Sequence, residues 1–443
     1  MVLQFIDREQ ELRELREAVK SRKQELVIIY GRRRIGKTEL ILEATRDVPR
    51  LYYLAVGERN LERFYGSCVR QFPEASRLKA DWEVLFDFLK DNVRCVILDE
   101  FQNLIAEDRN FLHLMQAITD VTLRGSSLKL FLLGSSVSVM TSQVLASPSP
   151  LYGRRTGSME LRGVSFFELK KFFPRSSAEE RACIYGFAGG VPFYLTKVTG
   201  PFWAWLEKEA RQEKGFLRDE VEFLLKYEFT ETRTYKLILE AIANGKATVG
   251  EIRDFVGVKR TDISPYLRNL LEVRLIKREI PVTESARTRQ GRYFLADNFL
   301  RFWFRYIYPR LSSIEEGVFD VRHVRESYHL YLGHIFEDIA REFLVRRPPF
   351  PLTAIGRWWF RDEEIDIVAF DEPGRQALFC ECKWQDAVDA RAVLAELKRK
   401  AALVRWRNAA RKERFAIFAR SFKEKIQEEG TVLFDLREID SAR

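Results

Sequence analysis

Short apolar runs alternate with amphipathic segments through the first third of the chain. Each run is four to six residues long and rich in leucine or β-branched residues, which is typical of a buried strand. Residues 9–19 place Leu12, Leu15 and Val19 on one face of a helix. Alternating strands and helices predict an α/β fold with a parallel sheet over residues 1–165. The clearest strand runs are residues 26–30, 95–98 and 128–133.

The pattern changes after this first domain. Residues 166–228 are mostly helical and predict a helical lid, and residues 229–310 have the element order of a winged helix-turn-helix. Residues 311–443 return to alternating strands and predict an α/β domain of the restriction-endonuclease type. The aromatic block at residues 299–308 favours a buried helix between domains, with the stacking of single-stranded bases as the alternative.

A glycine-containing segment between the first strand and the next helix fits the phosphate-binding pattern GxxxxGK[ST] at every required position. Gly31 and Gly36 let the backbone bend so that successive N–H groups and a helix N-terminus face a phosphate. Lys37 can reach the β- and γ-phosphates of ATP, and the Thr38 hydroxyl can bind Mg²⁺. A basic glycine turn is the plain alternative. The predicted nucleotide-binding residues here are Gly31, Arg32, Arg33, Arg34, Ile35, Gly36, Lys37, Thr38 and Glu39.

Two acids end the second strand run and fit a Walker B element. Asp99 would hold Mg²⁺ through its hydration shell, and Glu100 would polarise the water that attacks the γ-phosphate. The next run ends in Gly-Ser-Ser, where Ser135 or Ser136 is the candidate to sense the γ-phosphate or the attacking water. An ordinary Gly-Ser turn is the alternative at that position.

A second acidic set lies in the last domain. Asp366 and Glu381 fall on two alternating strands joined by a Pro-Gly turn, which predicts a hairpin. Side chains two apart on a strand share a face, so Glu381 and Lys383 point the same way. With Glu337 from a preceding helix, these acids would form an oxygen cage for Mg²⁺, and Lys383 would activate a water or stabilise negative charge. This is the PD-(D/E)XK nuclease pattern, and a solvated ion-pair face is the alternative.

The charge balance favours a polyanionic partner. The formal net charge is +9 and the pI is near 9.2. Residues 391–414 read as a basic helical stretch that either solvates a helix or grips a phosphate backbone. Cations in the third helix and wing of the predicted winged helix would meet DNA, although such folds also serve as protein-docking modules. These cations are Lys259, Arg260, Arg268, Arg287, Arg289 and Arg292.

Cysteine spacing and hydropathy argue against a zinc-binding, disulfide-rich, secreted or membrane-spanning protein. The five cysteines form no CxxC pair and there are four histidines, which argues against a zinc site and a disulfide framework. The first residues have no signal-peptide pattern, so a reduced cytoplasmic protein is expected. No apolar run approaches the about 20 residues that span a bilayer, which predicts no membrane partner. The sequence also allows the protein to form a homo-oligomer.

Together these motifs resemble the archaeal ATPases of the AAA+/STAND-like group that carry a C-terminal PD-(D/E)XK-like domain. The resemblance implies an ATP-binding core, a helical lid, a winged helix and a nuclease-like domain. It also implies that Arg8 and the break at Gly190 and Pro192 flank the adenine, and that Arg154 can approach a γ-phosphate. The nuclease motif departs from the family pattern because Ile365, and not proline, precedes its aspartate. The segments that carry the resemblance are residues 5–9, 30–38, 98–102, 133–136, 151–154, 189–192, 299–308 and 381–384.

The sequence thus predicts an ATP-hydrolysing switch coupled to DNA binding and to metal-dependent DNA cleavage. ATP and Mg²⁺ are the expected cofactors, and DNA is favoured over RNA as the nucleic-acid partner. One alternative is a non-cleaving ATP-dependent regulator whose C-terminal acids are vestigial or form structural ion pairs. A second alternative is an RNA-directed defence or toxin nuclease with the same chemistry.

Overall fold

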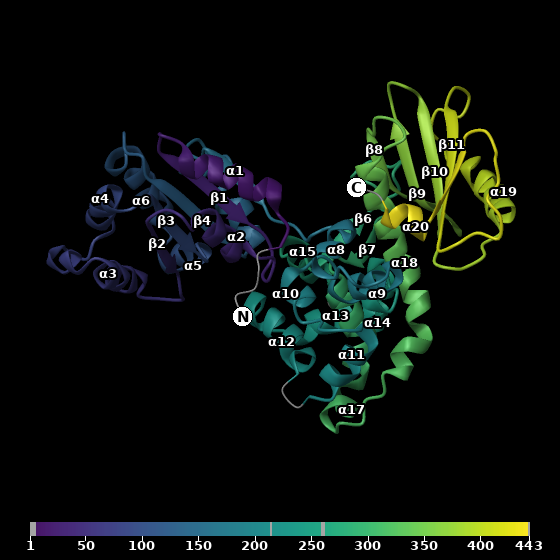
Figure 1. The fold of residues 1–443 in the computed structure, drawn as a ribbon, viewed down its shortest axis with the longest axis horizontal. Helices are drawn as coiled ribbons and strands as arrows, with labels where there is room; N and C mark the ends of the chain where they lie inside the picture. The colour runs from purple at the N-terminus through teal and green to yellow at the C-terminus, as the bar shows by residue number, and fades with distance from the viewer. Residues whose placement is uncertain (1–5, 213–214, 258–261, 442–443) are drawn as a thin grey trace. The chain divides into compact units, whose positions relative to one another are not determined.

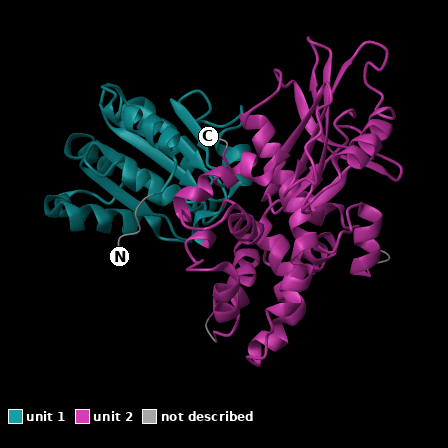
Figure 2. Cartoon of the chain, turned by 45° about the vertical axis from the view of Figure 1, so that its right-hand side comes forward, with its two compact units in different colours: residues 1–163, 191–193 teal, residues 164–190, 194–443 magenta. Residues whose placement is uncertain are grey.

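The computed structural model describes residues 6–212, 215–257 and 262–441. The chain divides into two compact units, the first formed by residues 1–163 with 191–193 and the second by residues 164–190 with 194–443 (Figure 2). Within the described ranges, no helix is long and apolar enough to cross a membrane.

The first unit is built on one five-stranded sheet, and every neighbouring pair of strands in it is parallel. The predicted α/β fold with a parallel sheet is therefore confirmed. β4 lies between β1, which leads into the phosphate-binding loop, and β3, which ends in Asp99. The tip of β4 therefore lies between these two motifs. In spatial order the strands are β2 (Arg50–Leu54), β3 (Cys95–Asp99), β4 (Lys129–Gly134), β1 (Glu25–Tyr30) and β5 (Gly157–Glu160).

Helices of the first unit cover this sheet with apolar faces (Figure 1). The central strands are buried along almost their whole length, as expected for a parallel sheet covered on both faces. Phe64 of α3 and Phe86 of α4 are fully buried, with their ring centroids 5.7 Å apart. The helices are α1 (Glu9–Lys20), α2 (Lys37–Ala44), α3 (Asn60–Gln71), α4 (Trp82–Asn92), α5 (Gln102–Glu107), α6 (Phe111–Ala117) and α7 (Val137–Val139).

The second unit begins with helices. Phe299, Phe302 and Trp303 are at most 2% exposed, so the aromatic block is core and these rings are not open to stack on bases. The longest helix, α18 (Arg322–Arg346), carries Tyr328 and Tyr331 into the same core. The preceding helices are α8 (Leu169–Phe172), α9 (Ala178–Ala188), α10 (Pro192–Leu195, which starts in the first unit), α11 (Phe202–Ala210), α12 (Phe216–Glu228), α16 (Asn298–Phe302) and α17 (Leu311–Glu315).

Three helices and an antiparallel pair of strands follow α12 in the chain. Thr248 starts the second of these helices with a capping box, in which its hydroxyl accepts from the Glu251 N–H and the Glu251 carboxylate accepts from the Thr248 N–H. Gly257 ends that helix at φ 75°. Lys259, Arg260 and Thr261 lie outside the described residues. The elements are α13 (Arg233–Ala243), α14 (Val249–Val256), α15 (Ser264–Glu272), β6 (Ile276–Glu279) and β7 (Arg292–Leu295).

The chain ends in a mixed five-stranded sheet (Figure 1). Ile417 packs with the α19 residues Leu394 and Leu397, whereas the neighbouring Phe418 contacts Phe343 of α18. Adjacent strand residues face opposite sides, so the two helices cover opposite faces of the sheet. In spatial order the strands are β12 (Thr431–Asp435), β11 (Lys412–Ala419), β10 (Gln376–Lys383), β9 (Glu363–Asp371) and β8 (Ala354–Phe360), and the last two helices are α19 (Ala390–Ala401) and α20 (Leu436–Asp440).

One expectation for this domain is wrong. Residues 391–414 do not form one basic helix, because α19 ends at Ala401 and β11 begins at Lys412. Arg411 is only 2% exposed and donates hydrogen bonds to the carbonyl oxygens of Ala401, Val404 and Trp406, which stabilises a loop. The high arginine and lysine content suggested helix, but tertiary capping of these carbonyls decided the local structure.

Candidate functional site: a nucleotide-binding loop and a separate acidic cluster

The phosphate-binding loop has the backbone that its glycines predicted. Gly36 has a φ of 89° directly before α2, and Gly31 has a φ of 155°. A Cβ atom on Gly31 would lie 2.4 Å from the carbonyl oxygen of Leu161, so only glycine fits there. Lys37 Nζ donates to the carbonyl oxygens of Gly31 and Arg32 at 2.8 and 3.0 Å. The ammonium group is thereby held inside the loop that would surround a phosphate.

Lys37 is 6% exposed. Burial lowers the pKa of Lys37 to about 8, although the charges of Glu100 and Asp99 act in the opposite direction. A buried ammonium group is costly unless an anion compensates it. The loop is therefore suited electrostatically to a polyanion such as a triphosphate.

Thr38 of the phosphate-binding loop contacts Asp99 of the Walker B strand, as these two motifs require. Thr38 Oγ1 donates to Asp99 Oδ2 at 2.6 Å, and Asp99 is 3% exposed. The hydroxyl of Tyr52 on β2 donates to the same oxygen at 2.9 Å. Burial, and next the charge of Asp99, raise the pKa of Tyr52 far above its usual range, so the phenol stays a hydrogen-bond donor. Sequence reasoning missed Tyr52, because only strand pairing brings β2 beside β3.

Contacts at the backbone N–H and at both carboxylate oxygens fix the position of Glu100. Its φ is 52°, in the left-handed region, and its N–H donates to Asp99 Oδ1 at 2.8 Å. Ser135 at the tip of β4 donates to Glu100 Oε2, and Gln102 donates to the same oxygen and to Ser135 Oγ. Arg33 Nη2 lies 3.4 Å from Glu100 Oε1. The structure therefore brings the predicted Ser135 to Glu100 and adds Gln102, which the sequence did not indicate. Arg33, predicted as a nucleotide-binding residue, also contacts Glu100.

The residues expected beside adenine have separate environments. Arg8 is 8% exposed at φ 76°, donates to the carbonyl oxygens of Ile35 and Arg162, and pairs with Glu11 at 3.0 Å. In the 191–193 segment, which belongs to the first unit, Pro192 lies 4.0 Å from the position of a Cβ on Gly36.

Two further residues predicted to bind the nucleotide, Arg34 and Gly190, are each packed within their own unit. The Arg34 guanidinium stacks on the Phe193 ring at 3.9 Å from its centroid. Gly190 belongs to the second unit, where a Cβ would lie 1.9 Å from the carbonyl oxygen of Val164. Close backbone packing alone therefore requires glycine at position 190.

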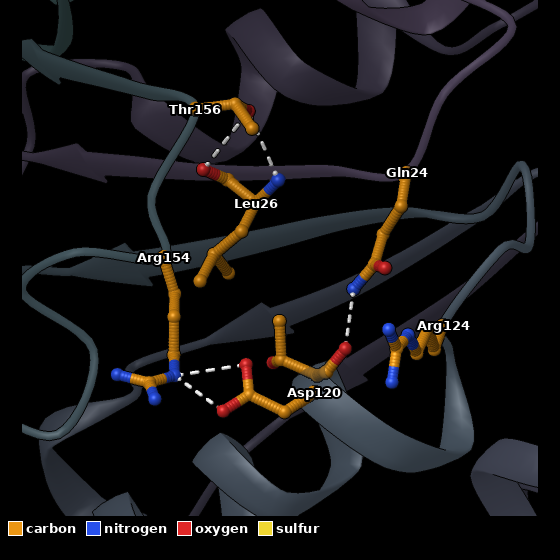
Figure 3. Close-up of a pocket in the computed structure, with 7 residues that line it drawn as sticks. Gln24, Leu26, Asp120, Arg124, Arg154 and Thr156 are labelled. Atoms are coloured by element: carbon orange, nitrogen blue, oxygen red, sulfur yellow. Dashed lines mark hydrogen bonds and ion pairs between the residues drawn. The ribbon is translucent and has the colours of Figure 1, made fainter.

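Arg154 does not lie at the phosphate-binding loop of its own unit. Its Nε donates to both carboxylate oxygens of Asp120 at 2.7 and 2.9 Å (Figure 3). Its Nη1 donates to the Pro150 carbonyl oxygen. This pocket also contains Leu26 and Thr156, which mark the N-terminal end of β1. The loop follows the other end of that six-residue strand, about 20 Å away. The expected approach of Arg154 to a γ-phosphate does not occur within this unit.

The C-terminal acids lie close enough to one another to interact electrostatically. The antiparallel register pairs Cys380 with Ile367, so Glu381 follows directly opposite Asp366. Asp366 Oδ2 accepts from the N–H of Cys382 at 2.7 Å. Burial, and then the charges of Glu337 and Glu381, raise the pKa of Asp366 well above its usual range. The three predicted carboxylates therefore interact electrostatically.

Protein cations already neutralise two of these acids. Lys383 Nζ lies 2.8 Å from Glu381 Oε1, and Lys400 of α19 lies 3.5 Å from Glu381 Oε2. Burial opposes the charged form of Lys383, but its hydrogen bond to Glu381 prevails and raises the pKa of Lys383. Arg357 pairs with Glu337, and within the described ranges no group of three or more His, Cys, Asp and Glu side chains is arranged to hold a metal ion. Sequence reasoning did not identify Arg357 or the pairing of Lys400.

The described cations of the predicted third helix and wing divide into two groups. Arg268, Arg287 and Arg289 are exposed. Arg292 instead pairs with Glu364 at 3.0 Å and stacks on Trp359, which ties β7 to the C-terminal sheet. Arg292 is therefore engaged inside the second unit.

Comparisons with known proteins support a nucleotide-binding site in the first unit. Residues 5–198 match a model described as an ATPase domain predominantly from Archaea, and residues 303–396 match one described as archaeal and bacterial proteins of unknown function. The chain is 48% identical to the uncharacterized protein MJECL04 of Methanocaldococcus jannaschii, over 90% of this chain and 92% of that protein. The chain belongs to the family of that protein, and its first unit is an ATPase domain.

One solved structure gives the same fold class. A Walker-type ATPase of Pyrococcus abyssi superposes with a TM-score of 0.52 at 23% identity, over 68% of this chain and 96% of that chain. The ORC2 protein of Aeropyrum pernix, in ADPNP–ADP complexes, has a TM-score of 0.44 at 16% identity, over 73% of this chain and 97% of that chain. The match to the archaeal ATPase domain model confirms the predicted ATPase family, and the winged helix and nuclease-like domain stay predictions.

Proposed function

We propose that the protein hydrolyses ATP and couples its nucleotide state to DNA binding and metal-dependent DNA cleavage by the second unit. The observation that carries the proposal is the pairing of two acid sets, each beside a lysine: Asp99 and Glu100 with Lys37, and Asp366 and Glu381 with Lys383. The net charge of +9 supports a polyanionic partner. In this proposal residues 229–310 act as a winged helix.

The residues of the first unit fit ATP with Mg²⁺. Thr38 Oγ1 and Asp99 Oδ2, 2.6 Å apart, are the oxygens that would hold Mg²⁺. The ion supplies neutralisation of phosphate charge when it is bound. Lys37 would exchange the carbonyl oxygens of Gly31 and Arg32 for phosphate oxygens. Tyr52 would keep the Asp99 carboxylate oriented through its hydroxyl.

Glu100 is the residue that would accept the proton of the attacking water. Ser135 and Gln102 fix its Oε2, and Arg33 lies on its Oε1. A fixed carboxylate costs little reorganisation when the water is deprotonated. Ser135 therefore acts as a positioning residue for Glu100 in this proposal.

In the second unit, Asp366, Glu381 and Glu337 are the residues that would hold Mg²⁺. Lys383 keeps its charge because of Glu381, so it would stabilise the developing negative charge on a phosphate rather than remove a proton. The buried, high-pKa Asp366 would ionise when a cation compensates the neighbouring acids.

A cleavage assay tests the proposal. Purified full-length protein would be incubated with linear and circular DNA and with RNA, with Mg²⁺ or Mn²⁺, and with ATP, ADP or no nucleotide. We expect DNA cleavage that Asp366→Asn and Glu381→Gln abolish. Glu363→Gln, which changes another acid of β9 and removes its ion pair with Arg399 of α19, should leave cleavage intact. Cleavage of RNA alone would replace this proposal by an RNA-directed nuclease.

A non-cleaving regulator is the second candidate, and a specific observation favours it. Arg357 is 13% exposed and contacts Glu279 of β6, Glu337 of α18 and Glu364 of β9. Its guanidinium supplies one of the positive charges that a metal ion would otherwise bring to these acids. If neither DNA nor RNA is cut under any nucleotide state while ATP is hydrolysed, the acids are a structural ion-pair cluster and the regulator stands.

A further inference from the structure

The turn between β9 and β10 and the loop before β11 lie at the same end of the C-terminal sheet. The N–H of Lys412 donates to the carbonyl oxygen of Arg375 at 2.8 Å, and Lys412 pairs in register with Gln376. Trp406 of the loop stacks on Phe370 near the end of β9, with centroids 4.2 Å apart. Two segments that are about thirty residues apart in the chain therefore form one surface.

This surface carries exposed cations, and we call it the cationic end. Arg375, Arg405 and Lys412 are exposed, and among the residues that the structure describes their side chains form no ion pair. Arg407 is 44% exposed and has a long contact of 3.6 Å to Glu372. The cationic end consists of Arg375, Arg405, Arg407, Lys412 and Arg414.

The positions of these cations are fixed by the fold. Arg411 holds the loop closed through three carbonyl oxygens, and its guanidinium lies over the Phe379 ring. Arg414 donates to the Pro349 carbonyl oxygen at 3.4 Å. A preorganised set of charges loses less conformational entropy on binding than charges on a free tail.

The cationic end and the acidic cluster lie at opposite ends of the same strands. Arg375 precedes β10, whereas Glu381 and Lys383 are at its end, and Asp366 is five residues from Asp371 in β9. Five strand residues span about 17 Å. At the acidic end, Lys383, Arg399 and Lys400 are engaged with Glu381 or Glu363. The exposed cations that form no ion pair among the described residues, Arg375, Arg405 and Lys412, therefore lie at the end opposite the acidic cluster, although Glu372 and Glu413 also lie near this end.

We propose that the cationic end binds the phosphate backbone of DNA and is a principal nucleic-acid contact of the second unit. The inference rests on the proposed function only for the identity of the polyanion. It adds that the backbone contacts lie about 17 Å from the acidic cluster, so a duplex can be held without its bound phosphates meeting the acids. An acidic polypeptide is the competing occupant, which the test distinguishes.

Fluorescence anisotropy of a short labelled duplex over a range of salt concentrations tests the inference with the full chain. The Arg375→Gln/Lys412→Gln variant should weaken binding roughly tenfold and flatten the log–log salt slope by about 1.8, since each lost phosphate contact removes about 0.9. The comparison variant is Arg287→Gln/Arg289→Gln, which removes two exposed cations from the other expected DNA contact, the predicted wing.

The binding measurements have four outcomes, and each one supports or overturns DNA binding by the cationic end. Loss with the first pair and a smaller change with the wing pair supports the inference. Loss only with the wing pair overturns it and leaves the proposed DNA binding intact. Tight binding of polyglutamate but not of the duplex overturns it in favour of an acidic protein partner. If the parent protein hydrolyses ATP but binds no duplex, the inference and the DNA part of the proposed function both fall.

Discussion

Arg33 Nη2 lies 3.4 Å from Glu100 Oε1, so an ion pair links the phosphate-binding loop directly to the Walker B acid. The contact joins two motifs that are more than sixty residues apart in the sequence. A γ-phosphate in the loop would offer Arg33 a second anion, which makes the pair a direct connection between nucleotide occupancy and the position of Glu100.

Glu100→Gln should bind ATP and hydrolyse it at least about 10²-fold more slowly, because only proton acceptance is removed. Calorimetric ATP binding and phosphate release measure the two effects separately. Glu107→Gln, another acid of the first unit that accepts from Arg59 and Asn60, serves as the control and should keep turnover. Turnover of Glu100→Gln equal to that of the parent would remove Glu100 from the mechanism.

Arg33→Ala should lower kcat more than it raises KM for ATP, because Arg33 contacts Glu100. In a double-mutant cycle, adding Arg33→Ala to Glu100→Gln should cause little further loss, since the coupling partner is already neutral. Additive losses in kcat would show that Arg33 acts on phosphate alone.

Lys37→Ala should abolish measurable ATP binding, because the ammonium group that faces the phosphate is lost. Equilibrium binding of a fluorescent ATP analogue measures the effect. Lys79→Ala changes an 80% exposed lysine of the same unit and should bind like the parent. Unchanged affinity in Lys37→Ala would contradict the assignment of the loop.

Arg357→Gln should destabilise the second unit, because removing one partner of a buried ion-pair set typically costs about 3–5 kcal/mol. Thermal denaturation with and without Mn²⁺ measures this. If the acids form a metal site, Mn²⁺ should restore much of the lost Tm by compensating Glu337 and Asp366. Arg361→Gln, at the exposed β8–β9 turn, is the control. A loss that Mn²⁺ does not reverse would favour the structural ion-pair cluster.

Glu342 should make stability depend on pH. It accepts from the Tyr185 hydroxyl and from the Phe166 N–H, and burial raises the pKa of Glu342 from 4.5 to about 7. The folded state thus binds more protons than the unfolded state between these values, so stability falls as pH rises through this window, by about 3 kcal/mol in total.

Glu342→Gln, which mimics the protonated acid, should flatten the decline in Tm between pH 5 and pH 8. The exposed Glu326→Gln on the same helix should leave the decline unchanged. An equally steep decline in Glu342→Gln would assign the pH dependence to other groups.

Features that depend on local geometry could be predicted from the amino-acid sequence. Gly31, Gly36, Lys37 and Thr38 lie within eight consecutive residues, and a strand period of two is enough to place Glu381 and Lys383 of β10 on one face. The alternation of strands and helices was equally sufficient for the α/β class. Such local signals are readable because burial and backbone conformation act on neighbouring residues.

The tertiary structure decided whatever depends on which strands pair and in which direction. The order β2-β3-β4-β1-β5 brings Tyr52 to Asp99 and Ser135 to Glu100, and it leaves Arg154 at the far end of β1. In the second unit, the parallel pairing of β10 with β11 separates the basic loop from the acidic cluster. Strand order follows from the burial of apolar faces between segments distant in sequence, and a linear pattern of residues does not encode that partner choice.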